Sequence, residues 1–299
     1  MNAGISYIAV IFIWATSPIA IKLSVSGFSP FAAISWRIAL AVMVAALMVA
    51  LFYSEAGLKK RNWRAYAAAS LAIFPTMPIV YVAANYVPSG LISVLFGTTP
   101  FIMGLLSMVI LGEQPFSKPK VLGLLLSLGG VILVALDQLS LGEGAFYGVL
   151  LLCGSNVVWS LSNILVKKFS VRVNSFEQTL GAMAFSLPGL LLCWGLTGAD
   201  FGSGDNVKAV WAILYLAFVG SLLGFLAFYN VLQHMPVATV SLIPVITPLL
   251  AVFVGISFGG EHLSKTVLAG TGLIVFGLAV HEFLPRLLSR KGVGKKAGA

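Results

Sequence analysis

The sequence predicts an all-α protein that crosses a membrane ten times. Hydrophobic residues make up 59% of the 299 positions, charged residues only 9%, and the mean hydropathy is +1.03. Soluble domains carry about 25% charged residues. Apolar runs of about 20 residues, the length of a spanning helix, recur along the chain. No stretch alternates in polarity as β-barrel strands do.

Glycine, proline, asparagine or charged residues separate the apolar runs, and no connection is long enough for a soluble domain. The predicted spans are residues 5–25, 30–53, 65–86, 88–111, 119–136, 146–167, 176–197, 207–231, 236–258 and 265–284.

Lysine and arginine gather in one set of connections, Lys59–Arg64, Lys118–Lys120 and Lys167–Arg172, and in the tail that begins at Arg286. Basic loops of membrane proteins stay in the cytoplasm. Both termini are therefore predicted to be cytoplasmic, in a multi-pass protein of the bacterial inner membrane. The net charge of +9 comes mainly from these loops, so we expect no nucleic-acid partner.

The chain contains an internal repeat. The segment Pro88–Glu113 returns as Pro236–Glu261, 148 residues later, with Ser, Thr-Pro and Gly-Glu at matching places. We predict two five-helix repeats, residues 1–140 and 141–285, and a basic cytoplasmic tail, 286–299. Because five is odd, the second copy enters the membrane from the opposite side. Inverted repeats are typical of secondary transporters, which bind substrate near the midplane between the repeats.

Each repeat opens with W-x-x-S-x-x-x-x-K, at Trp14–Lys22 and Trp159–Lys167, and has a proline-containing fourth helix that ends in Gly-Glu. With these features the chain resembles, over nearly its whole length, the EamA family of the drug/metabolite transporter superfamily. It is most similar to the ten-helix exporters of amino acids, including aromatic ones, and of metabolites. The small four-helix members exchange protons through a glutamate in the first helix. Trp14 occupies that region here, so their mechanism is not implied.

Polar side chains inside spans must face protein or a wet cavity. The first, third, fourth, sixth, eighth and ninth spans hold almost all of this polarity, so we predict that they line the pathway. The candidate substrate-contacting residues are Trp14, Ser17, Arg37, Tyr81, Asn85, Thr98, Thr99, Trp159, Asn163, Tyr229, Asn230 and Thr247. Close helix packing is the alternative role for each small polar residue.

Four prolines are hinge candidates: Pro75, Pro78, Pro100 and Pro248. A proline inside a helix leaves a carbonyl one turn back unpaired and kinks the helix. Such a kink either moves as a gate or shapes a fixed bend. We favour the gate at Pro100 and Pro248.

Charged residues are scarce within the spans. Arg37 lies about two turns inside the second span, where it either binds a substrate carboxylate or extends to the outer interface, and we favour the interface. Glu113 and Glu261 are expected to cap the helices that follow them. Glu177 is expected to favour the start of its own helix. No catalytic motif or metal-ligand spacing occurs, so we expect no enzyme activity, cofactor or metal.

These observations predict a secondary transporter that exports aromatic or neutral amino acids, or similar small metabolites, by alternating access. A mostly uncharged cavity of aromatic and hydroxyl groups suits a zwitterion with an apolar side chain. The alternatives are a broad-specificity drug efflux protein and a non-transporting membrane scaffold or sensor. The expected partners are the small-molecule substrate and the lipid bilayer, and the chain is expected to act as a monomer.

Overall fold

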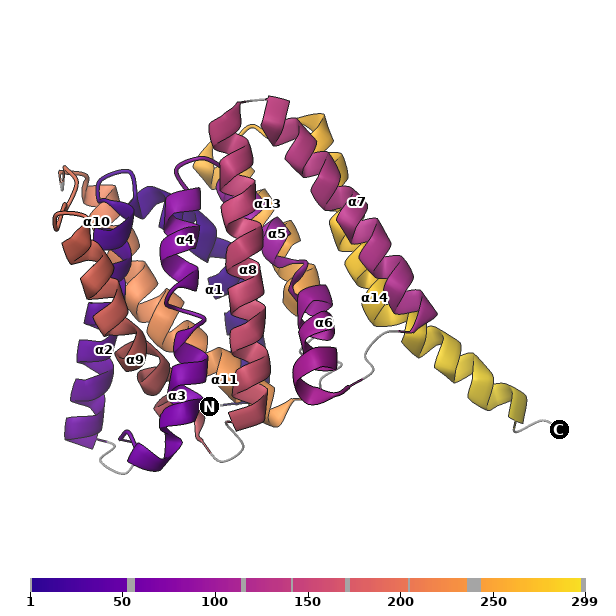
Figure 1. The fold of residues 1–299 in the computed structure, drawn as a ribbon, viewed down its shortest axis with the longest axis horizontal. Helices are drawn as coiled ribbons and strands as arrows, with labels where there is room; N and C mark the ends of the chain where they lie inside the picture. Colours follow the sequence, from indigo (N-terminus) through magenta and orange to yellow (C-terminus); the bar gives the residue numbers. More distant parts are fainter. Residues whose placement is uncertain are drawn as a thin grey trace.

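The computed structural model describes residues 2–52, 57–113, 117–140, 142–169, 173–203, 205–235 and 243–296, and every regular element in these ranges is a helix (Figure 1). Eight helical segments of this described part are long and apolar enough to cross a membrane, and Ile243–Gly259 forms a shorter apolar helix. The predicted class, an all-helical polytopic membrane protein, is confirmed. The count of ten spans stays a prediction.

The first half of the chain forms α1 (Ala3–Ser24), α2 (Pro30–Phe52), η2 (Lys60–Asn62), α3 (Trp63–Ser70), α4 (Thr76–Ala83), α5 (Ser89–Phe96), α6 (Thr99–Leu111) and α7 (Lys118–Ser140). The second half forms α8 (Glu143–Phe169), α9 (Ser175–Leu196), α10 (Val207–Tyr215), η3 (Leu216–Leu223), α11 (Gly224–His234), α13 (Ile243–Gly259) and α14 (Lys265–Lys296). The basic segment after residue 285 continues α14 rather than leaving it.

The third predicted span, 65–86, is interrupted, so the prediction of one continuous helix there is wrong. α3 ends at Ser70 and α4 begins at Thr76, because Pro75 has no N–H to donate to the carbonyl of Leu71. The Thr76 hydroxyl donates a hydrogen bond of 2.6 Å to the carbonyl of Leu71. This bond satisfies one of the backbone acceptors that the interruption releases.

The fourth predicted span is also divided, between α5 and α6, rather than kinked at its proline. Gly97 and Thr98 separate the two helices, and Pro100 lies in the first turn of α6, where a missing N–H costs no helix bond. Asn156 on α8 donates to the carbonyl of Leu95 (3.1 Å) and to the Thr98 hydroxyl (2.9 Å). A side chain from the second half of the chain therefore stabilises this break.

The matching helix of the second half, α13, runs without interruption through Pro248. Val245 and Ile246 stand where the first half has Gly97 and Thr98. Val245 and Ile246 have neither the backbone flexibility of Gly97 nor the hydroxyl of Thr98. The two stretches therefore fold differently although both contain Thr-Pro.

The pair α7 and α14 lies at one side of the molecule in Figure 1 and packs through glycines. A methyl group added at Gly130 would lie 2.6 Å from the carbonyl oxygen of Gly270, and one at Gly123 would lie 2.5 Å from that of Gly277. Glycine allows this close approach of two helices in a membrane. Gly123 matches Gly270, and Gly130 matches Gly277, in the sequence repeat, so the repeat converts one contact into the other.

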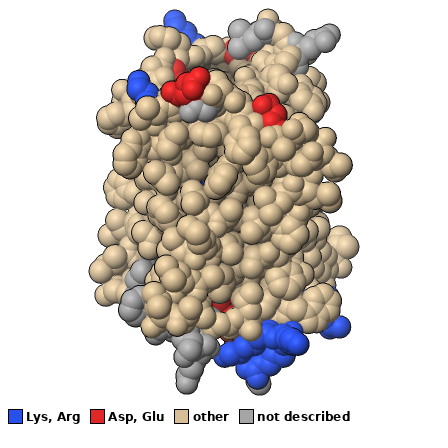
Figure 2. Space-filling model, turned by 90° about the vertical axis from the view of Figure 1, so that its left-hand side faces the viewer, with Lys and Arg blue, Asp and Glu red and all other residues tan. Residues whose placement is uncertain are grey.

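Charges are concentrated at the two ends of the molecule. Figure 2 shows lysine, arginine and acidic residues above and below a broad belt that is free of them on the face drawn. Large apolar side chains such as Phe12, Leu125 and Phe253 point outward from the helices and are exposed. Such a belt is what a lipid environment requires. In Figure 1, α1 begins and α14 ends toward the lower edge.

Candidate functional site

A cavity of about 710 Å³ lies between helices of the two halves. Its wall comes mainly from α1, α5, α6, α8, α11 and α13, with one or two residues from each of several other helices. Small-molecule sites range from about 300 to 1,000 Å³. The cavity is open at the end where Lys167, 59% exposed, stands in its wall, and this end is called the Lys167 end below.

Aromatic rings from both halves form one side of the cavity. Trp14 meets Trp159 edge to face, with ring centroids 5.9 Å apart, and lies 4.7 Å from Phe228. Trp159 also lies 6.3 Å from Phe225. Because these rings offer a large apolar surface with an N–H at the edge of each indole, they can bind an apolar or aromatic group.

Arg37 is buried in the cavity wall, with 5% of the residue exposed. Its Nε donates to the hydroxyl of Ser221 at 2.7 Å, and its Nη1 donates to the hydroxyl of Tyr81 at 3.3 Å. The expectation that Arg37 extends to the membrane surface is therefore wrong. Two hydroxyl groups hold the guanidinium inside the protein instead.

The structure brings eight of the twelve predicted residues to this cavity: Trp14, Ser17, Arg37, Thr99, Trp159, Asn163, Tyr229 and Thr247. The other four lie outside its wall. Tyr81 supports Arg37, Thr98 contacts Asn156, Asn230 donates to Ser6, and Asn85 is exposed. Of the hinge candidates, Pro100 and Pro248 line the cavity, whereas Pro75 and Pro78 do not.

Four polar residues that sequence reasoning missed also line the cavity: Gln178, Gln233, His281 and Glu282. Gln178 donates to the carbonyl of Ala65 at 3.0 Å, and the His281 ring lies 4.8 Å from that of Phe101. The helices of Gln178, His281 and Glu282, α9 and α14, hold little mid-membrane polarity, and Gln233 lies beyond the predicted eighth span. Nothing in the sequence therefore distinguished these residues from loop-facing or packing residues.

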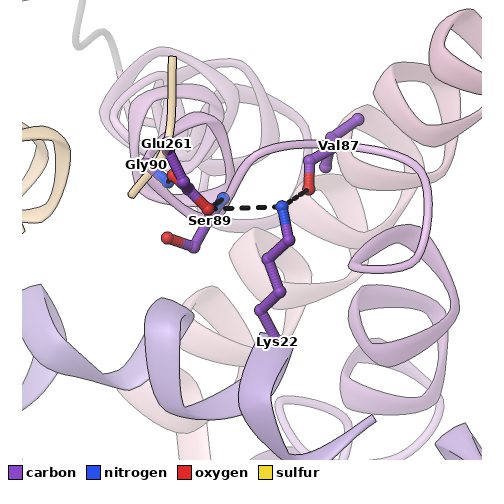
Figure 3. Close-up of polar contacts among 5 residues, drawn as sticks. All are labelled: Lys22, Val87, Ser89, Gly90 and Glu261. Atoms are coloured by element: carbon purple, nitrogen blue, oxygen red, sulfur yellow. Dashed lines mark hydrogen bonds and ion pairs between the residues drawn. The ribbon is translucent and has the colours of Figure 1, made fainter. Parts of the chain in front are cut away.

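Glu261 lies at the opposite end of the molecule, which is called the Glu261 end below, and Figure 3 shows its contacts with Lys22 and Ser89. Its carboxylate accepts hydrogen bonds from the backbone N–H groups of Ser89 (2.7 Å) and Gly90 (3.3 Å), at the start of α5. Lys22 donates to the same carboxylate and to the carbonyl of Val87, both at 3.3 Å. Glu261 is only 8% exposed, and neither it nor Lys22 reaches the cavity wall.

The prediction that Glu261 caps the helix after it is therefore wrong. The first helix after Glu261 is α14, whereas its carboxylate bonds to α5, about 170 residues earlier in the chain. Two backbone donors at the start of α5 and Lys22 of α1 bind the negative charge more effectively than the solvated start of α14 can. Glu177 also bonds outside its own helix, because Tyr66 and Asn62 donate to its carboxylate.

An equivalent ion pair stands at the Lys167 end. Lys167 and Glu113 are 2.7 Å apart, and both side chains are substantially exposed. Lys167 matches Lys22, and Glu113 matches Glu261, in the sequence repeat. Each pair joins the two halves of the chain. One pair is thus packed against a helix start, while the other stands in an open cavity mouth.

The EamA-like transporter family matches the chain twice, over residues 2–136 and 146–281. The chain belongs to this family. Among curated EamA-like relatives, the uncharacterized transporters YvbV and YoaV of Bacillus subtilis are 28% and 22% identical. The YvbV match covers 80% of this chain and 76% of YvbV, and the YoaV match covers 92% and 95%. The uncharacterized inner membrane transporter YedA of Escherichia coli is 24% identical over 65% of this chain and 62% of its own.

A protein of known crystal structure shares the fold, with a TM-score of 0.68 at 19% identity, over 95% of this chain and 98% of the other. At this identity the likeness concerns the fold alone. The family match and the names of the relatives indicate a polytopic membrane transporter of the EamA-like family. The solute is not specified by these relatives.

Proposed function

We propose that the protein exports small organic solutes, namely neutral or aromatic amino acids or similar metabolites, across the bacterial inner membrane by alternating access. The observation that carries this proposal is the cavity between the two halves. It opens at the Lys167 end and is separated from the Glu261 end by the contacts of Glu261 with Lys22 and α5.

The positive-inside rule places the Lys167 end in the cytoplasm, since Lys118, Lys120 and Arg286 belong to the same set of basic connections. The solute then enters from the cytoplasm and meets the aromatic wall. Release to the other side requires Glu261 to leave Lys22 and the start of α5. The open mouth must close at the same time, which would bury the exposed Lys167–Glu113 pair.

An inverted repeat supports this exchange, because two matching structures can adopt each other's conformation. The two ion pairs and the two glycine contacts between α7 and α14 are each related by the sequence repeat. On this proposal, the present structure has the first-half lysine paired with a buried glutamate and the second-half lysine paired with an exposed one. The outward-open state would reverse the two roles.

Counterflow in proteoliposomes tests the proposal. Vesicles loaded with unlabelled phenylalanine, methionine or threonine should accumulate the labelled compound transiently, and protein-free vesicles should not. The absence of saturable counterflow for every amino acid would overturn the assignment of the solute class. Saturable flux of tetraphenylphosphonium instead of amino acids would favour a drug efflux protein.

A further inference from the structure

Arg37 carries a positive charge that no carboxylate of the described part of the chain neutralises. The ion pairs of those residues involve Lys22, Lys167, His281 and Arg286, and Arg37 forms none of them. Its two hydrogen-bond acceptors are the neutral hydroxyls of Ser221 and Tyr81. A buried charge without a counter-ion is costly, so a site of this kind favours an anionic ligand.

The guanidinium borders the cavity, because Arg37, Ser17 and Gly220 all belong to its wall. A methyl group added at Gly220 would lie 3.2 Å from Cδ2 of Leu216, 3.5 Å from Nη2 of Arg37 and 3.6 Å from Oγ of Ser17. Gly220 and Ser221 belong to η3, a π-helical segment. Such segments are frequent at functional sites. Here η3 supplies both the hydroxyl that holds Arg37 and the glycine that packs beside it in the cavity wall.

The aromatic wall begins one helical turn away from this part of the cavity. A methyl group at Gly224 would lie 3.7 Å from Nε1 of Trp14. Gly224 follows Gly220 by four residues, and Trp14 precedes Ser17 by three. Each offset corresponds to a rise of about 5 Å along its helix, so the indole of Trp14 lies about one helical turn from the guanidinium. A carboxylate on Arg37 would therefore leave the apolar part of the same molecule against the rings.

The charges of the cavity wall agree with this arrangement. Among the described residues of the wall, Arg37, Lys120 and Lys167 are basic, and Glu282 is the single acidic residue. An ammonium group on the ligand would meet aromatic faces rather than a carboxylate deep in the cavity. The carboxylate of Glu282 already contacts His281 and Arg286, so the wall provides a defined partner for a ligand carboxylate and mainly aromatic faces for an amine.

We propose that Arg37 binds the carboxylate of the transported solute in a forked, two-bond contact, and that the solute's amino group is not required for binding. This inference rests on the proposed transport function and narrows its solute to carboxylates with an apolar or aromatic group. Guanidinium matches carboxylate geometry better than a lysine ammonium does. Both amino acids and simple organic monocarboxylates carry this chemistry.

Three ligands that share a phenyl group distinguish amino acids from simple monocarboxylates as the bound solute. Phenylalanine, 3-phenylpropionate, which lacks the amine, and phenethylamine, which lacks the carboxylate, would be titrated against the full chain in nanodiscs while tryptophan fluorescence is recorded. The two carboxylates should bind with dissociation constants within about tenfold of each other, and phenethylamine should bind at least tenfold more weakly. Equal binding of phenethylamine would overturn the proposal, as would binding of phenylalanine but not of 3-phenylpropionate.

Variants at the site provide the second measurement. Arg37→Gln and Arg37→Lys should each weaken binding of 3-phenylpropionate at least tenfold, whereas Arg61→Gln, in the short exposed helix η2, should leave it unchanged. Gly220→Ala adds a methyl group to the cavity wall 3.5 Å from Nη2, and should weaken binding by crowding the guanidinium while Arg37 itself is retained. Gly220→Ala tests the site in place of the Arg37 variants if size-exclusion chromatography shows that those variants do not fold.

Counterflow distinguishes the two proposals. If Arg37→Gln or Gly220→Ala binds and exchanges phenylalanine as the wild type does, the carboxylate site is wrong and the transport function stands. If the wild type binds the carboxylates but shows no flux of any of them, the transport function fails and the site stands.

Discussion

Trp14 and Trp159 occupy matching positions in the two halves, and their rings meet in the cavity. Trp14→Ala removes a ring that contacts both Trp159 and Phe228. We expect binding of phenylalanine to weaken by about three- to tenfold, because aromatic contacts contribute roughly 0.5–1.5 kcal/mol beyond the area that they bury. A scintillation proximity assay with labelled phenylalanine measures the change without relying on fluorescence.

Trp211→Ala is the matched control, because Trp211 is 67% exposed and lies outside the cavity wall. Its removal should leave the dissociation constant unchanged. An equal loss of affinity in both variants would indicate that the aromatic wall does not bind the solute.

At this scale, the sequence predicted the types of residue that meet in the cavity but not all of their partners. Trp14, Trp159 and Thr99 could be selected because polar and amphipathic side chains are rare in spans. The partner of Glu261 lies on α5, about 170 residues away in the chain. Burial of Arg37 depends on Ser221, which only the packing of α2 against η3 brings near. No local pattern encodes such contacts.

The pairing of α7 with α14 depends on glycines at the crossing. Gly130→Ala would place a methyl group 2.6 Å from the carbonyl oxygen of Gly270 and 2.7 Å from Cγ1 of Ile274. Because the contact atoms are largely backbone, the helices must separate, and we expect a loss of about 1–3 kcal/mol of stability. Thermal unfolding in detergent, followed by size-exclusion chromatography, should show a lower midpoint.

Gly272→Ala, on α14, provides the comparison, because no atom lies within 4 Å of the added methyl group. Its midpoint should equal or exceed that of the wild type, since alanine favours the helix over glycine by about 1 kcal/mol. A similar loss in both variants would exclude close packing as the cause.

Helices were the most predictable level of the structure, and their interruptions were the least. Hydropathy located α1, α2 and α7 to within a few residues of their ends. The break between α3 and α4 coincides with Pro75, but proline alone does not distinguish a kink from an interruption, as the continuous α13 demonstrates. Whether a helix breaks also depends on partners for the backbone groups at the break. Between α5 and α6, Asn156 of the distant helix α8 donates to the carbonyl of Leu95.

The whole molecule combines two ion pairs that the repeat relates but that stand in different environments. Glu261→Ala removes the carboxylate from the closed end, and we expect that end to open more often. A helix cap contributes about 1 kcal/mol, so the open population should rise about fivefold. The measurement is labelling of Ile21→Cys, in the cavity wall, by an impermeant maleimide added from the Glu261 end, with Cys153 and Cys193 replaced by alanine.

Glu113→Ala removes the matching carboxylate at the Lys167 end and should not raise this labelling, because that end is already open. Equal labelling in the wild type and in Glu261→Ala would show that Glu261 does not restrain the closed end.

The hydrogen bonds of Glu261 to α5 bear on how much energy the proposed transport cycle needs. A single cap with a partly solvated lysine favours the closed end by about 1–2 kcal/mol, which corresponds to roughly five- to thirtyfold in population. Thermal motion alone crosses a bias of that size. On the proposed function, the empty carrier then returns to the state that is open at the Lys167 end without energy supplied at the Glu261 end. A transport step without ion coupling would follow the concentration difference of the solute, so accumulation at the Lys167 end would itself drive export.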